Sequence, residues 1–104
     1  MKIGILLPYK ENYSPNYPGS ISIFLKDVIN FSTFKKNTTI YGSTNYSNRF
    51  SKNYINIDLK KKLFSSLTKQ YLNKFIDKTS NKKIDILEIH NRPNYVKYLL
   101  KSFD

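Results

Sequence analysis

The stretch that decides the fold is Ile84-Asp85-Ile86-Leu87-Glu88-Ile89-His90-Asn91-Arg92-Pro93, close to the end of a chain of 104 residues. Its first six positions are mostly apolar and predict a short, mostly buried strand. The strand stops at a polar cluster, and Pro93 suits the first turn of a helix, with Asn91 or Arg92 in the cap region. In open parallel sheets ligands bind at the carboxyl ends of the strands, so the turn at His90 is the first candidate for a functional site.

Two helices are predicted from apolar residues at helical spacing, one near each end of the chain. Residues 93–103 have apolar side chains at helical spacing, with Lys97 and Lys101 on the other face. The apolar positions of this helix are Val96, Leu99, Leu100 and Phe103. Gly19 and Ser20 open an earlier helix with the clearest periodicity in the sequence. Its predicted core face consists of Ile21, Phe24, Leu25, Val28 and Ile29, with Ser22, Lys26, Asp27 and Asn30 opposite.

The remaining segments predict three more strands and one more helix. Residues 2–8 are almost wholly apolar, as in a central strand buried on both faces, and Gly4 marks the close approach of a neighbour. Two further strands are predicted at residues 38–42 and 54–57, separated by a polar loop. Asp58 would cap a helix running from about residue 61 to residue 78. Its apolar stripe is Leu63, Phe64, Leu67, Tyr71, Leu72, Phe75 and Ile76.

The order of these elements predicts an α/β fold: a Rossmann-like, mainly parallel sheet between helices in three layers. The first strand and the strand at residues 84–89 should lie side by side in its middle, which brings the turns at Gly19 and His90 to one edge. The strand at residues 84–89 would keep one unpaired flank, an aggregation hazard. We therefore expect residues 1–104 to be the first part of a longer protein.

Composition excludes several classes of function. The chain has no cysteine and one histidine, so neither a thiolate metal site nor a histidine cluster is available, and no metal is expected. No early apolar run is long enough for a secretory signal, which makes the cytoplasm the default compartment. The net charge of +11 comes mainly from lysines scattered through every segment. We interpret them as solvated surface residues and expect no nucleic-acid partner; contact with anionic membrane lipids or phosphorylated substrates stays open.

The first strand is followed by a loop that ends at Gly19 and then by a predicted helix, and this succession is typical of an anion-binding site. Free N–H groups and the helix dipole attract negative charge at a helix N-terminus, and glycine allows close approach. One glycine is not the G-x-G-x-x-G pattern, and a plain helix start after Pro18 explains the segment equally well.

The first strand, the glycine turn and above all residues 85–93 resemble the amino-terminal domain of family 4 glycosyltransferases with the GT-B fold. The resemblance covers essentially the whole chain and implies the acceptor-side half of a two-domain, retaining enzyme of hexosyltransferase type. Such an enzyme moves a sugar from a nucleotide-sugar to a glycan or lipid-linked acceptor, as in cell-envelope polysaccharide or lipopolysaccharide synthesis. It would work in the cytoplasm, with peripheral contact at the inner face of the membrane left open.

The resemblance also assigns residues. His90 would reach the donor sugar, and Gly19 with Ser20 would approach the donor diphosphate. The candidates for the acceptor side or the cleft are Tyr9, Asn91, Arg92 and Asn94. Many family members have two glycines at the turn where this chain has one. The nucleotide pocket and paired glutamates of the second domain are missing, so this part alone should be inactive; neither a metal nor a cofactor is implied.

Plainer interpretations remain beside these. His90 could simply bond to backbone at a strand end, and Arg92 could pair with Glu88 or Glu11 at the surface. We interpret Glu88 and Asp85 as structural. The alternative to a transferase is a small non-enzymatic module of the flavodoxin-like or receiver-like kind. Pro8-Tyr9-Lys10 after the first strand matches neither the phosphate loop nor the acidic pair that such modules need.

Overall fold

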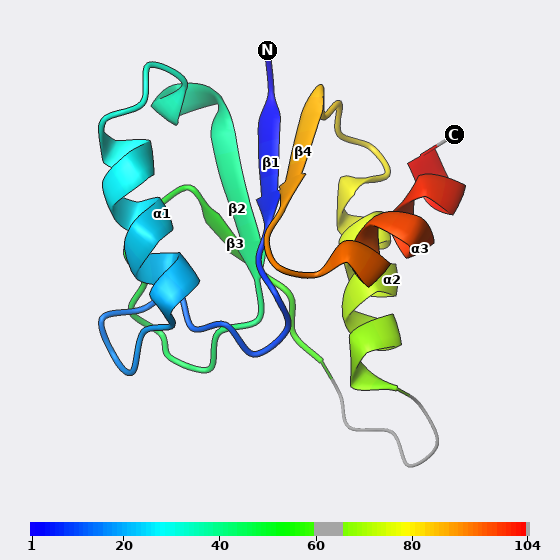
Figure 1. Cartoon of the computed structure of the whole chain (residues 1–104), viewed down its shortest axis with the longest axis horizontal. Helices are drawn as coiled ribbons and strands as arrows, with labels where there is room; N and C mark the ends of the chain where they lie inside the picture. Colours follow the sequence, from blue (N-terminus) through cyan, green and yellow to red (C-terminus); the bar gives the residue numbers. More distant parts are fainter. Residues whose placement is uncertain (60–65, 104) are drawn as a thin grey trace.

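The structure is a computed structural model that describes residues 1–59 and 66–103. Its centre is a four-stranded sheet in which all neighbouring strands are parallel (Figure 1). The strands are β1 (Ile3–Leu6), β2 (Thr38–Gly42), β3 (Tyr54–Asn56) and β4 (Ile86–Ile89), arranged in the order β3-β2-β1-β4. The predicted Rossmann-like parallel α/β fold is confirmed.

Helices cover both faces of this sheet, as the three-layer prediction requires. Helix α1 (Ser20–Asn30) lies on one face, and α2 (Leu67–Thr79) and α3 (Pro93–Phe103) lie on the other (Figure 1). A short 3-10 turn, η1 (Lys35–Asn37), leads into β2. The predicted starts of α1 and α3 are confirmed, whereas the predicted start of α2 near residue 61 lies outside the described residues, as do Leu63 and Phe64.

Two apolar cores result, one on each face. Side chains alternate along β1, so Leu6 joins the core under α2 and α3 while Ile5 and Leu7 join the core under α1. The first core is built from Leu6, Tyr41, Ile57, Tyr71, Leu72, Phe75, Tyr95 and Leu99. The second is built from Ile5, Leu7, Tyr13, Leu25, Ile29 and Ile40. A Cβ added to Gly4 would lie 3.3 Å from the Ile84 side chain, which confirms the close approach predicted there.

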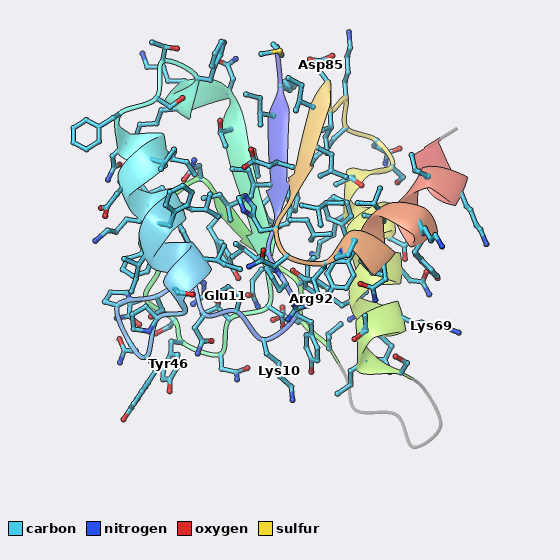
Figure 2. All side chains as sticks on the ribbon, viewed as in Figure 1. Lys10, Glu11, Tyr46, Lys69, Asp85 and Arg92 are labelled. Atoms are coloured by element: carbon cyan, nitrogen blue, oxygen red, sulfur yellow. The ribbon has the colours of Figure 1, made fainter. Side chains whose placement is uncertain are left out.

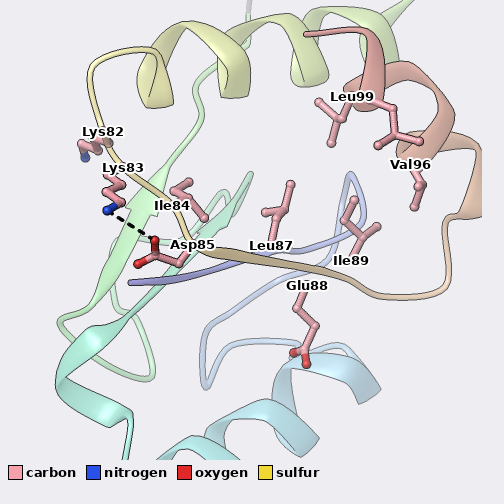
Figure 3. A pocket seen from close by; sticks show the side chains of 10 residues that line it. Lys82, Lys83, Ile84, Asp85, Leu87, Glu88, Ile89, Val96 and Leu99 are labelled. Carbon is pink, nitrogen blue, oxygen red and sulfur yellow. Dashed lines mark ion pairs between the residues drawn. The ribbon is translucent and has the colours of Figure 1, made fainter. Parts of the chain in front are cut away.

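The prediction of a mostly buried strand at residues 84–89 is wrong. β4 lies beside β1 and keeps an unpaired flank, as predicted, but it is an edge strand and does not lie in the middle of the sheet, since it pairs with β1 alone among the described strands. Leu87 and Ile89 pack towards α2 and α3, whereas Glu88 points to the opposite side of the sheet (Figure 3). Ile86, on the same side as Glu88 by alternation, is 47% exposed. The apolar run correctly predicts that a strand forms here, but it does not show that both faces of the strand are buried.

Two predicted helix faces are also partly wrong. On α1 the buried residues are Ser22, Leu25 and Ile29, while Phe24 and Val28 are exposed. The small Ser22 is buried where the Glu11 carboxylate reaches the helix and accepts a hydrogen bond from the Ser22 hydroxyl. On α3, Tyr95 and Leu99 are buried, but Val96 and Leu100 are exposed because they face the open side of β4.

The predicted helix cap at Asp58 is wrong as well. The N-cap of α2 is Ser66, whose hydroxyl accepts a hydrogen bond from the Lys69 N–H at 3.4 Å. Asp58 instead accepts a hydrogen bond from the side-chain amide of Asn56 at 2.6 Å. Capping needs a side chain next to the first helical turn, and Asp58 lies well before it.

Tyr71 joins α2 to the end of the central strand. Its hydroxyl donates to the carbonyl oxygen of Leu7 at 2.6 Å, and its ring is fully buried. Burial raises the pKa of Tyr71 well above its ordinary value. Burial also raises the pKa of Tyr13, Tyr41 and Tyr54.

Replacing Tyr71 by phenylalanine should lower the free energy of unfolding by about 1 to 2 kcal/mol, because the Leu7 carbonyl loses a buried donor. The folded chain holds the Tyr71 proton more tightly than the unfolded chain, so stability is unaffected below about pH 10 and falls above it. The Tyr71→Phe variant should show a shallower alkaline decline. Urea denaturation between neutral pH and pH ~11 measures both effects.

The matched control is Tyr98→Phe, which removes an exposed hydrogen bond from Tyr98 to the Asn73 side chain. It should change stability by less than about 0.5 kcal/mol and leave the alkaline decline as it is. Equal effects of the two variants would contradict the role given to Tyr71.

Candidate functional site

The carboxyl ends of β1 and β4 meet where the connections of the sheet change sides. Helix α1 links β1 to β2 across one face, and α2 links β3 to β4 across the other (Figure 1). Leu6 pairs with Ile89, so the turns that follow these two residues start next to each other. Ligands of open α/β sheets bind at such switch points. We call this edge the rim, and define it by residues 7–20 and 90–94.

The rim contains all the candidate site residues named from the sequence, which are Tyr9, Gly19, Ser20, His90, Asn91, Arg92 and Asn94. The carboxyl ends of β1 and β4 and the start of α1 lie at one end of the molecule (Figure 1), and Figure 2 shows Lys10, Glu11 and Arg92 at that end. Asp85 lies at the opposite end (Figure 2). The turns at Gly19 and His90 therefore share one edge, as predicted.

His90 is held by Glu88. The Nε2 atom of His90 lies 2.8 Å from Oε2 of Glu88, and the two side chains are 23% and 52% exposed. A carboxylate only accepts hydrogen bonds, so the imidazole hydrogen sits on Nε2. The Nδ1 atom is then left as an acceptor in neutral imidazole and as a donor in imidazolium. A histidine held in one tautomer and partly open to solvent is suited to bind a hydroxyl or phosphate oxygen.

The turn after β1 is fastened to the start of α3. The Tyr9 N–H donates to the hydroxyl of Tyr95 at 3.1 Å, and the Tyr9 ring packs 5.7 Å from the ring of Tyr71. The Lys10 ammonium lies 5.7 Å from the centre of the Tyr9 ring. Tyr9 is therefore a support of the rim that remains partly exposed.

Both turns contain a residue with left-handed backbone. Lys10 has φ 74° and Asn91 has φ 53°. Asparagine tolerates this conformation, but a lysine is strained in it. Strained residues gather at functional sites because the surrounding structure can hold them in place. The two residues lie in the two turns that the sheet brings together.

Arg92 and Asn94 are exposed beside His90. The guanidinium of Arg92 donates to the carbonyl oxygen of Asn91 at 2.7 Å, and the Arg92 carbonyl accepts from the Tyr95 N–H at 3.0 Å. The two carboxylates suggested as its partners are engaged elsewhere: Glu88 with His90, and Glu11 with the start of α1. Arg92 thus keeps most of its donors facing solvent.

The start of α1 holds a carboxylate of the chain itself. Oε2 of Glu11 accepts hydrogen bonds from the Ser22 N–H at 3.2 Å and from the Ser22 hydroxyl at 2.7 Å. Gly19 is the N-cap, and a Cβ added there would overlap the Glu11 carboxylate. Ser20 is exposed and α1 has no acidic residue in its first turn. The anion that neutralises this helix end in the structure is therefore Glu11.

The loops beside the rim are packed by aromatic rings. Tyr13 is buried, stacks on Tyr54 with centroids 5.4 Å apart, and meets Phe50 edge to face. Tyr17, in contrast, is 80% exposed and stacks on Tyr46. Tyr13 therefore packs the loop from inside, whereas the ring of Tyr17 lies at the surface.

Sequence reasoning missed two carboxylates. Residues two apart in a strand point to the same side, so the spacing of Glu88 and His90 could have shown that they meet. Glu11 reaches Ser22 across a loop, and no sequence spacing predicts that contact. A helix that begins with glycine and lacks an acidic first turn was the available hint.

Two cavities are lined by residues outside the rim, although the first reaches Glu88 and Ile89 next to it. A cavity of about 730 Å³ follows the outer side of β4 beneath α3, lined by Ile84, Leu87, Ile89, Val96, Leu99 and Leu100 together with four charged residues (Figure 3). A second one, of about 340 Å³, lies near Lys2 and Lys36. The rim is an open surface by comparison.

Comparisons with protein-family models, with curated protein sequences and with solved structures found no match. The likeness of residues 85–93 to family 4 glycosyltransferases therefore stays a prediction. Among residues 1–59 and 66–103 no three His, Asp or Glu side chains gather as metal ligands would. In the same part of the chain, no helix has both the length and the apolar character needed to cross a membrane.

A double-mutant cycle tests what Gly19 does. Glu11→Ala should cost about 1 kcal/mol of stability, because α1 loses the anion at its N-terminus. Gly19→Ala should also destabilise the chain, because the new methyl group displaces the Glu11 carboxylate. In the double variant the second change should cost about 1 kcal/mol less than it does alone. Chemical denaturation of the four proteins measures the coupling.

Ser20→Ala is the control, since Ser20 is exposed next to Gly19 and its replacement should be additive with Glu11→Ala. Additive effects of the Gly19 and Glu11 variants would show that the carboxylate does not occupy this site in solution.

Proposed function

We propose that this chain is the amino-terminal, acceptor-side part of a retaining glycosyltransferase of the GT-B kind. It would transfer a sugar from a nucleotide-sugar to a glycan or lipid-linked acceptor of the cell envelope. The observation that carries the proposal is the pair of His90 and Glu88 at the switch point, 2.8 Å apart and open to solvent. The likeness of the surrounding sequence adds the reaction class.

The chemistry needs an electrostatic partner on each side of the bond that breaks. The bond from the sugar C1 to the donor diphosphate breaks with charge building on the diphosphate. A bond from the acceptor oxygen to C1 forms on the same face of the sugar, and the proton of the acceptor hydroxyl passes to the departing diphosphate. The sugar becomes oxocarbenium-like in between, so hydrogen bonds that fix its hydroxyls lower the barrier. His90, oriented by Glu88, supplies such a bond from this part, and Arg92 supplies positive charge nearby.

Glu11 sets a condition on donor binding. A diphosphate at the start of α1 would meet a carboxylate that already accepts both Ser22 hydrogen bonds. Either the carboxylate swings away when the donor arrives, or the donor phosphates stay outside this turn. In both cases Glu11 makes the free site neutral and keeps inorganic anions from binding tightly.

The proposal requires a second lobe facing the rim, with the nucleotide pocket and the groups that complete the reaction. The coding DNA after the Asp104 codon should encode it, with about 200 or more residues in an α/β pattern. Residues 1–104 alone should transfer no sugar. A complete non-enzymatic module would instead bind a ligand by itself, which calorimetry with flavin mononucleotide checks.

His90→Ala should lower sugar transfer by the two-lobed polypeptide on the order of 10²-fold, mainly in kcat, because the lost bond acts on the reacting sugar. Glu88→Gln should have a smaller effect, since it loosens the imidazole without removing it. Transfer is followed as release of nucleoside diphosphate and as product from a radiolabelled sugar.

Asp77→Asn, an exposed carboxylate on α2, is the control and should leave the rate unchanged. If His90→Ala works at the rate of the unmodified enzyme, His90 has no part in the reaction.

Glu11→Gln should tighten binding of the nucleotide-sugar by about tenfold if the donor diphosphate enters the start of α1, because a repulsive charge is removed. Calorimetry on the two-lobed polypeptide measures the dissociation constant, with Asp27→Asn as a control of equal charge change at an exposed site on the same helix. Equal affinities for Glu11→Gln and Asp27→Asn would place the diphosphate elsewhere.

A further inference from the structure

Helix α1 carries an apolar strip on its outer surface. Phe24, Val28 and Phe31 follow one another at steps of four and three residues, so they share one side of the helix. They are 59%, 47% and 92% exposed, and Phe34, which lies beyond the end of α1 directly before η1, is 45% exposed. We call these four residues the α1 strip. Single exposed apolar residues are ordinary, but three phenylalanines and a valine in succession are not.

Positive charge lies at the end of the α1 strip. Lys35 and Lys36 follow Phe34 directly and are exposed on η1. The nearest acidic residue on α1 is Asp27, whose carboxylate lies 3.7 Å from the ammonium of Lys26. The chain as a whole carries +11. Lys35 and Lys36 have no ion-pair partner among residues 1–59 and 66–103. An apolar strip that ends in such lysines is complementary to a lipid surface, which is apolar beneath a negatively charged layer of headgroups.

The shape of this surface points to the same partner. Helix α1 forms the outermost layer on its side of the sheet (Figure 1), and no residue of α1 lines either cavity described above, although Lys36 borders the second. A protein partner would have to supply a groove shaped to these rings. A bilayer needs none, because phenylalanine rings sink into the acyl boundary while lysines reach the phosphates.

We infer that the α1 strip docks the protein on an anionic lipid bilayer, with the phenylalanines inserted and Lys35 and Lys36 at the headgroups. The helix would lie along the membrane surface. This inference is independent of the proposed transfer reaction. If both hold, the lipid surface is also where a lipid-linked acceptor would be met.

The 104-residue chain is centrifuged with vesicles of phosphatidylcholine alone and with vesicles that also contain phosphatidylglycerol. We expect binding to the second kind, weakened by salt. The double variant Phe24→Ser with Phe31→Ser should lose about tenfold or more in affinity, and so should Lys35→Glu with Lys36→Glu. All four side chains are exposed, so the variants should fold, which circular dichroism checks.

The matched control is Lys97→Glu with Lys101→Glu, the same change of charge on the exposed side of α3. It should bind nearly as well as the unmodified chain. Equal loss in both lysine variants would mean attraction by total charge alone and would overturn the inference. So would full binding by the phenylalanine variant, or no binding by the unmodified chain.

Insertion is read out separately with tryptophan, which the chain lacks. Phe31→Trp should shift its fluorescence to the blue on anionic vesicles and be quenched by brominated lipids, while Lys97→Trp should not respond. Sedimentation equilibrium without lipid tests whether a second copy of the chain binds the α1 strip instead. A dimer that the phenylalanine variant abolishes would assign the α1 strip to a second copy and overturn the membrane inference.

Discussion

The pairing of β1 with strands on both of its sides is the constraint on which the rest of the structure depends. Ile5, Leu6 and Leu7 are buried, and they divide between the two cores. β1 pairs with β2 on one side and with β4 on the other. Because connections between parallel strands are right-handed, the helices that lead to β2 and to β4 must then lie on opposite faces of the sheet. The rim is a consequence of that topology. The turns after β1 and β4 would meet there whatever residues they contained.

Two carboxylates then define the chemistry of the rim. Glu88 holds the imidazole of His90, and Glu11 satisfies donors at the start of α1. Each binds a group that sequence reasoning had reserved for a ligand. For His90 the contact strengthens the proposed role, because it fixes a tautomer and leaves the other nitrogen free. For Gly19 and Ser20 it changes the role: the turn attracts anions, and the protein supplies one of its own.

The sequence predicted the elements better than the faces they bury. Runs such as residues 38–42, and signals such as Gly19 before α1 and Pro93 at α3, are local, and the structure confirms them. Burial depends on how many neighbours an element has. Ile86 is exposed because β4 is an edge strand, a fact that its own apolar run does not contain. The contact between Glu88 and His90 could have been predicted, because residues two apart in a strand point to the same side. The contact of Glu11 with Ser22 could not, because it depends on the conformation of the loop between them.

The surfaces proposed for transfer and for docking are compatible because α1 runs along the strands, from their carboxyl ends to their amino ends. It begins at the rim with Ser20 and ends at the opposite edge, where Phe31, Phe34 and the two lysines follow (Figure 1). The most exposed ring of the α1 strip, Phe31, therefore lies at the end of the helix far from His90. A bilayer held by that end of α1 leaves the rim open to a second lobe. The described non-glycine residues with left-handed backbone, Lys10, Tyr17 and Asn91, likewise all lie in the rim, where the hydrogen bond from Tyr9 to Tyr95 ties the turn after β1 to α3.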